Sequence, residues 1–188
     1  IYLFHITPAL ILGFTNIVLV KLIFDKENFK NSKFINFLSL IIFCFVNIFF
    51  YRLAEHGTDR SGMILVLLTI IFILNLLNVN PVFITTEKQT DLIKIIFIIL
   101  CFVPSIKPFF LINLLFIIII FFHKDYKKFF KKIIFSKTFC YCLSFLFLTI
   151  FYTFINSGCL VFPVPFLCLE NFSWSVDKSQ VNDVKIWF

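Results

Sequence analysis

Long apolar runs, separated by short polar segments, organise almost the whole chain. The runs cover residues 1–24, 35–53, 63–79, 92–106, 109–122 and 138–155. A helix needs roughly 20 residues to cross the hydrocarbon core of a bilayer, and most of these runs approach that length. The pattern therefore predicts an all-α, polytopic membrane protein with about six spanning segments.

The fourth and fifth runs are the shortest, and only Lys107 and Pro108 separate them. Proline cannot continue a helix without losing a backbone hydrogen bond and clashing with the preceding turn. Two interpretations follow. Residues 92–122 form either a hairpin of two short spans or one long helix kinked at Pro108. The choice fixes the sidedness of every segment upstream.

The distribution of lysines favours the hairpin. The segment between the fifth and sixth runs has one acid, Asp125, and a series of lysines, which the positive-inside rule assigns to the cytoplasm. With a hairpin, the lysine-rich segment at 21–33 also faces the cytoplasm. The segment 54–62 and the tail from residue 156 then share the extracytoplasmic side. The lysines that fix this orientation are Lys124, Lys127, Lys128, Lys131, Lys132 and Lys137.

Composition agrees with a membrane location. Hydrophobic residues make up 61% of the chain and charged residues only 14%, whereas about a quarter of a soluble domain is charged. The formal charge of +7 would suggest nucleic acid in a soluble protein. Here the lysines lie between apolar runs, so no nucleic-acid partner is expected. The chain starts at Ile1 and ends directly after an amphipathic stretch, so we expect a fragment of a longer polytopic protein.

The chain therefore divides into a transmembrane helical domain, residues 1–155, and an extracytoplasmic tail, residues 156–188. Val181 and Val184 recur at helical spacing near the end of the tail. This predicts a short amphipathic helix lying on the membrane surface. The alternative is a re-entrant or lid segment over a site, to which Glu170 or Asp177 would contribute.

Two of the six cysteines, Cys159 and Cys168, flank a segment of the tail that contains Pro163 and Pro165. In an oxidising compartment they could pair, and closing a loop of about ten residues would stabilise the fold by roughly 2.5–3 kcal/mol. The other interpretation is two small buried residues. The remaining four cysteines lie in apolar runs, where cysteine behaves as a small hydrophobic residue.

One charged block interrupts the apolar pattern. The stretch RLAEHGTDRSGMIL places Arg52, Glu55, His56, Asp59 and Arg60 within nine positions. Carboxylates four residues apart share a helix face and shift each other's pKa, so that one can act as a general base. Together with His56, they also make a divalent metal site conceivable, although three ligands in five residues are a weak signal. We expect no protein-ligated metal.

The same block has a simpler interpretation as an outer turn. Gly57 and Gly62 would supply the bends, and Thr58, Asp59 or Ser61 would cap the next helix. That interpretation explains the glycines and the cap. It leaves Glu55 and His56 without a role.

Two stretches, RLAEHGTDRSGMIL and SGCLVFPVPFLCLENFSWSV, resemble blocks of a group of large bacterial polytopic membrane proteins associated with surface-polysaccharide genes. Those proteins look like multispanning glycosyltransferases that use polyprenyl-phosphate sugars. Their second block typically reads Ser-Gly-aromatic-Pro, whereas here Cys159 and Leu160 follow Ser157 and Gly158. A disulfide at Cys159 would therefore be a local feature of this chain.

The resemblance implies a role in envelope glycan synthesis at the bacterial inner membrane, with membrane lipid and a lipid-linked sugar or glycan as partners. Glu55 and Asp59 are the candidate catalytic residues, because an acceptor hydroxyl must lose a proton. Arg52, His56 and Arg60 are the candidate substrate-binding residues, since arginine forks onto phosphate. The alternatives are a transporter or flippase, and a structural membrane subunit without catalysis. The cofactor is left undetermined, with a divalent metal as the candidate.

Overall fold

The computed structural model describes residues 3–24, 33–49, 59–78, 86–122, 133–162, 164–169 and 172–186. Within these ranges every regular element is helical, and the only β contact is one isolated antiparallel bridge between Cys159 and Cys168. The predicted all-α class is confirmed. The elements are α1 (Leu3–Phe24), α3 (Lys33–Phe49), α4 (Asp59–Asn78), α5 (Thr86–Ile106), η1 (Pro108–Leu114), α6 (Leu115–Phe122), α8 (Lys137–Ser157), η2 (Pro165–Leu167) and α9 (Lys178–Ile186).

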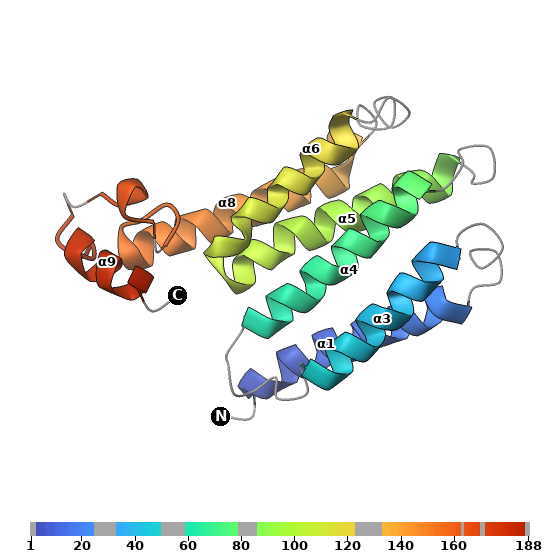
Figure 1. The fold of residues 1–188 in the computed structure, drawn as a ribbon. Coiled ribbons are helices and arrows are strands. Elements are labelled where there is room, and N and C mark those ends of the chain that lie inside the picture. The colour runs from blue at the N-terminus through green and yellow to red at the C-terminus, as the bar shows by residue number, and fades with distance from the viewer. Residues whose placement is uncertain are drawn as a thin grey trace.

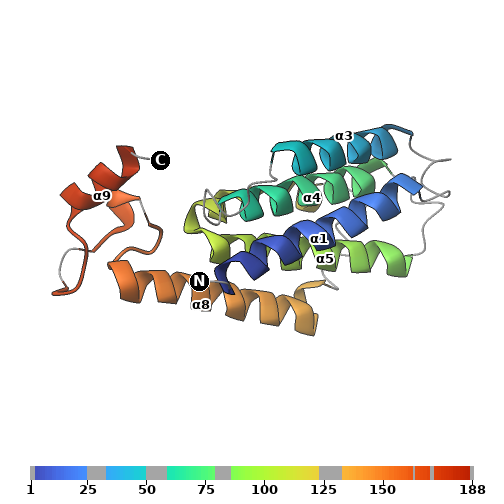
Figure 2. The ribbon, with the colours of Figure 1, turned by 90° about the horizontal axis from the view of Figure 1, so that it is seen from below.

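The long helices run side by side and reverse direction from one to the next (Figure 1). Helix α1 packs against α3 and α4, α4 packs against α5, and α5 packs against α8. Figure 2 shows the same layer from below, with α8 along one side of the bundle. A continuous core of aliphatic side chains from α1, α3, α4 and α5 joins these helices, including Leu19, Ile42, Leu68 and Ile96.

Four helices are long and apolar enough to cross a membrane, within residues 6–24, 60–77, 89–106 and 137–157. The expectation of six spanning segments is not supported. Helix α3 has 17 residues and the arm formed by η1 and α6 is also short. The apolar runs were read correctly as helices, but two of them fall below the length that a span requires.

The chain turns back at Lys107, which selects the hairpin over the kinked helix. Lys107 is extended, with φ −152° and ψ 124°, and Pro108 opens η1 directly after it. The N–H of Phe110 donates to the carbonyl of Lys107 at 3.0 Å, which closes the turn. Helix η1 then packs against α5, and α6 continues back along the bundle (Figure 1).

Some polar side chains in the bundle bond to each other or to their own helix, whereas buried polar atoms of Thr15, Asn36, Ser39, Ser61 and Gln89 have no hydrogen-bond partner. Asn16 of α1 and Asn47 of α3 exchange two side-chain hydrogen bonds of 2.9 Å each. Thr69 Oγ1 donates to the carbonyl of Leu65 at 2.8 Å. In a bilayer such bonds keep polar groups away from the hydrocarbon. The bonded amides and hydroxyls are therefore carried at a low cost.

The alternation of the helices sorts their ends into two groups (Figure 1). The start of α4, the turn at Lys107 and the end of α8 lie at one end of the bundle, which we call the tail end. The opposite end holds the end of α1, the starts of α3 and α5, and the start of α8. Among the described lysines, Lys21, Lys33 and Lys137 lie at this second end, whereas Lys107 lies at the tail end (Figure 1).

Candidate functional site

Of the charged block, the structure describes only the last two residues, Asp59 and Arg60. Arg52, Glu55 and His56 lie outside the described residues. Asp59 is the first residue of α4, and Arg60 follows it with a partly buried side chain. The block therefore leads into the first turn of a membrane-length helix at the tail end.

Gly62 has a packing role and is not a bend. It lies inside the first turns of α4, where a methyl group in its place would overlap the ring of Phe110. The expectation that Gly62 bends an outer turn is wrong, because the helix has already begun at Asp59. Its missing side chain lets η1 approach α4 closely, so the first turns of α4 and the hairpin turn are packed together.

Ser61 is also placed differently from the capping role considered for it. Its side chain is buried, and its hydroxyl has no hydrogen-bond partner. A capping serine precedes the helix and accepts a bond from a backbone N–H of the first turn. Ser61 lies within the helix, so any cap of α4 comes from an earlier residue.

The second block forms a small folded unit attached directly to the end of α8, which we call the tail module (residues 158–186). Gly158 ends α8 in the left-handed conformation, with φ 72°, and its N–H donates to the carbonyl of Phe154 at 2.8 Å. This is the helix ending at which glycine is favoured. The chain later returns, and the N–H of Val176 donates to the carbonyl of Ser157 at 3.1 Å. The module is thus fastened to α8 at both its start and its middle.

Cys159 and Cys168 form a disulfide at the centre of the tail module. They are opposite one another in the antiparallel bridge, and Leu160 N–H to Leu167 carbonyl and Leu169 N–H to Gly158 carbonyl close it at 3.0 Å each. This is the close, non-hydrogen-bonded pairing of an antiparallel ladder. The predicted disulfide is confirmed.

Helix α9 packs inward onto this disulfide. Val181 is fully buried beside Cys159 and Cys168, with Phe162 and Val176 at the edge of the cluster. The expectation of an amphipathic helix with its valines on the membrane is wrong for Val181. Ser179, Gln180, Asn182 and Asp183 are exposed on the other side of α9, so its outer surface is polar.

An aromatic series links the last turns of α8 to the tail module. Phe154 of α8 meets Phe172 edge to face, with ring centroids 5.8 Å apart. Phe172 in turn stacks on Trp174 at 4.7 Å. Such pairs contribute about 0.5–1.5 kcal/mol beyond simple burial. They add a third attachment between the module and the span.

The two blocks share one end of the bundle without lying over one another. The tail module extends beyond the end of α8, and in neither view does it cover the start of α4 (Figures 1 and 2). Asp177 is exposed on the module, and Glu170 lies outside the described residues. The described part of the tail therefore has no lid over the charged block.

Ionisable side chains of the described helices lie near helix ends. The exception closest to the middle of a span is Lys94, which pairs with Asp91 at 2.8 Å on an exposed surface. Within the described ranges, no group of three or more His, Cys, Asp or Glu side chains could hold a metal ion. Among the described residues, charge chemistry is therefore concentrated at the two ends of the bundle.

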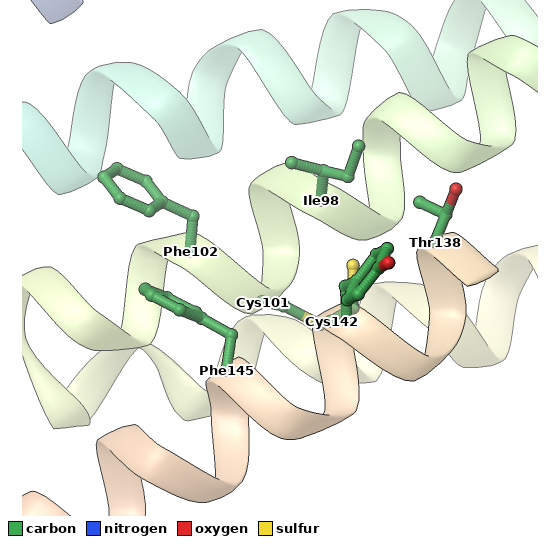
Figure 3. Close-up of a pocket in the computed structure, with 7 residues that line it drawn as sticks. Ile98, Cys101, Phe102, Thr138, Cys142 and Phe145 are labelled. Carbon is green, nitrogen blue, oxygen red and sulfur yellow. The ribbon is translucent and has the colours of Figure 1, made fainter.

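A cleft between α5 and α8 is a feature that the sequence did not indicate (Figure 3). It has a volume of about 480 Å³ and is almost entirely apolar. Cys101 of α5 and Cys142 of α8 both line it, and Phe102 stacks on Phe145 with ring centroids 6.1 Å apart (Figure 3). Its lining is Ile98, Cys101, Phe102, Thr138, Tyr141, Cys142 and Phe145.

No curated protein and no solved structure is significantly similar to this chain. One family model, described as a domain of unknown function, DUF8201, matches residues 4–187. The match begins in the second residue of α1 and ends after α9, so it covers both the bundle and the tail module. The chain belongs to the DUF8201 family.

Proposed function

We propose that this protein is a multi-pass protein of the bacterial inner membrane that works in envelope polysaccharide biosynthesis. It transfers sugar from a lipid-linked donor, or polymerises such glycans, at the extracytoplasmic face. The observation that carries the proposal is that Asp59 and Arg60, the described end of the charged block, and the disulfide-linked tail lie at one end of an otherwise apolar bundle (Figure 1). Among the described lysines, Lys21, Lys33 and Lys137 lie at the other end, as expected for the cytoplasmic side (Figure 1).

The oxidised Cys159–Cys168 pair supports the orientation independently of the lysines. Disulfides persist in the periplasm and are rare in the cytoplasm. A lipid-linked sugar holds its chain in the bilayer and its phosphate at the surface. Charged residues at the rim of a span are therefore at the depth where the reacting groups lie.

In this proposal the acids, the arginines and the histidine of the charged block have different roles. Glu55 is the general base that takes the proton of the acceptor hydroxyl, and Asp59 is the second carboxylate. Arg52 and Arg60 hold the phosphate of the leaving group, and His56 contacts the substrate. The apolar cleft between α5 and α8 offers a lipid chain a place beside the spans.

The placement of charge argues against an ion-coupled transporter as the second candidate. Such proteins carry ionisable residues deep within their spans. In the described spans the middle turns hold asparagine, serine and threonine, and Lys94 is already paired with Asp91. This distribution of ionisable side chains fits a reaction at the membrane surface better than the transfer of protons or ions through the bilayer.

The substitution Glu55→Gln tests the catalytic role, because it keeps the shape of the side chain and removes the base. We expect glycan output to fall by about 10²–10⁴-fold, the usual contribution of a general base, while the amount of protein in the membrane stays normal. Asp183→Asn is the matched control, since it neutralises an exposed acid of the tail module. If Glu55→Gln cells make normal glycan, the protein has a structural role or uses another base.

Orientation is tested by single-cysteine labelling with an impermeant reagent. The background replaces only Cys44, Cys101, Cys140 and Cys142, so that the disulfide remains. We expect Lys107→Cys and Ser179→Cys to be labelled in intact cells, and Lys137→Cys only after permeabilisation. Ser61 is unsuitable as a reporter because it is buried. Labelling of Lys137→Cys in intact cells would reverse the orientation.

A further inference from the structure

The length of α8 fixes the depth of the tail module relative to a bilayer. Its 21 residues span about 31 Å, close to the roughly 30 Å of a hydrocarbon core. Ser136 caps the start of the helix, and Gly158 ends it. Because the module begins at Gly158 without a linker, it must start where the hydrocarbon gives way to the headgroups.

The bridge within the module has two faces of different character. Neighbouring residues of an extended segment point to opposite sides. Cys159 and Cys168 point inward to Val181, so Leu160 and Leu169 belong to the opposite side. Leu160 and Leu169 are 45% and 48% exposed. We call this side the leucine face.

Exposed aromatic residues continue the apolar character of the module. Phe166 at its η2 turn is 81% exposed, and Trp174 is 51% exposed while stacked on Phe172. Phe172 in turn contacts Phe154 of α8, so this surface is continuous with the span. Tryptophan is enriched at the boundary between hydrocarbon and water. By contrast, α9 exposes Ser179, Gln180, Asn182 and Asp183.

The exposure of α8 indicates that lipid contacts the leucine face. Helix α8 is the least buried of the four membrane-length helices, and its principal packing partner is α5. Phe147, Phe151 and Ile155 on its outer half are exposed. In a bilayer those side chains meet acyl chains, and the module follows them directly.

We propose that the tail module is an interfacial anchor. Its leucine face, Phe166 and Trp174 insert at the boundary between headgroups and acyl chains, and α9 faces water. The partner is zwitterionic phospholipid. From residue 156 onward the sequence has three acids, Glu170, Asp177 and Asp183, against Lys178 and Lys185, so the attraction is apolar and needs no anionic lipid. This inference rests on the membrane location in the proposed function and is independent of glycosyl transfer.

Single-tryptophan fluorescence in vesicles of phosphatidylcholine tests this depth. Trp187→Phe leaves Trp174 as the only tryptophan of the chain. Three further reporters are built on Trp174→Phe/Trp187→Phe: Leu169→Trp on the leucine face, Ser179→Trp on α9, and Phe147→Trp on the exposed side of α8. Each is compared in vesicles whose lipids carry bromine at a shallow or a deep position of the acyl chain.

We expect Trp174 and Leu169→Trp to lose more intensity to shallow than to deep bromines, and to emit at shorter wavelength than Ser179→Trp. The latter should be quenched by aqueous iodide. If Phe147→Trp is quenched by bromine while Trp174 and Leu169→Trp are not, the anchor is wrong although the membrane location holds. If Phe147→Trp is also unquenched, the membrane location itself fails. Quenching of Ser179→Trp by shallow bromines would invert the proposed orientation and overturn it.

Discussion

The bundle and the tail module hold similar apolar side chains in place by different means. The bundle buries a continuous series of aliphatic residues from four long helices. Among its described apolar side chains, the tail module buries Cys159, Cys168 and Val181. It relies instead on a disulfide, on backbone bonds to the end of α8 and on contacts among three aromatic rings. A long helix in lipid satisfies its own backbone, whereas a short irregular segment needs a covalent link to remain ordered.

Removal of the disulfide should have the largest effect, because it destabilises the tail module and leaves the bundle unchanged. In Cys159→Ser/Cys168→Ser the tail module should lose roughly 3 kcal/mol of stability, because the loop of about ten residues is no longer closed. A core of three residues cannot replace that contribution. Limited trypsin digestion should then cut rapidly after Lys178, while circular dichroism shows the helices of the bundle unchanged. Equal digestion rates for the variant and the parent would show that the module does not depend on the disulfide.

A second substitution acts on the bundle alone. Gly62→Ala places a methyl group against the ring of Phe110, and overpacking of this kind typically costs about 1–3 kcal/mol. The unfolding midpoint in a denaturing-detergent titration should fall, with no change in the digestion of the tail. Gly13→Ala is the matched control, because nothing lies within 4 Å of the added carbon. It should be neutral or stabilising by up to about 1 kcal/mol, since alanine favours helix.

A double variant tests whether the ring of Phe110 causes the loss of stability in Gly62→Ala. Gly62→Ala/Phe110→Leu removes the ring that the methyl group meets and should recover part of the loss. If the double variant is no more stable than Gly62→Ala, the cost arises elsewhere in α4.

Much of the fold follows from the sequence because a segment that crosses hydrocarbon must be long, apolar and helical. The apolar runs predicted the long helices. The distribution of lysines favoured a hairpin, which the turn at Lys107 confirms. Helix α5 nevertheless begins at Thr86, six residues before the apolar run at Leu92. Polar residues at the end of a helix are satisfied by water or headgroups, so the end of a run does not mark the end of a helix.

The candidate site was less predictable, because its contacts join residues far apart in the chain. Nothing near Gly62 in the sequence reveals that Phe110 packs on it. The valine spacing of α9 was real, but Val181 could face either a membrane or a disulfide, and periodicity alone does not name the partner. The cleft between α5 and α8 joins side chains of residues 98–102 with side chains of residues 138–145. No local motif indicates that these two segments meet.

The smallest expected effect concerns the amide pair of the bundle. Asn16 and Asn47 each donate one hydrogen bond to the other, and Asn47 also donates to the carbonyl of Phe43 at 2.8 Å. Interhelical bonds in membranes are worth about 0.6–2 kcal/mol. Asn16→Leu and Asn47→Leu should each lower the midpoint of detergent unfolding slightly, because the remaining amide loses its partner in an apolar interface.

The double variant Asn16→Leu/Asn47→Leu separates the pair from its neighbours. With both amides gone, leucines pack against one another and neither amide is left without its partner. The loss of stability in the double variant should therefore be smaller than the sum of the two single losses. The coupling energy from this cycle should be about 1 kcal/mol. Strict additivity would mean that the two bonds contribute nothing together, and that α1 and α3 are held by their aliphatic contacts alone. Digestion of the tail should stay unchanged in all three variants, because the tail module is ordered by its own disulfide.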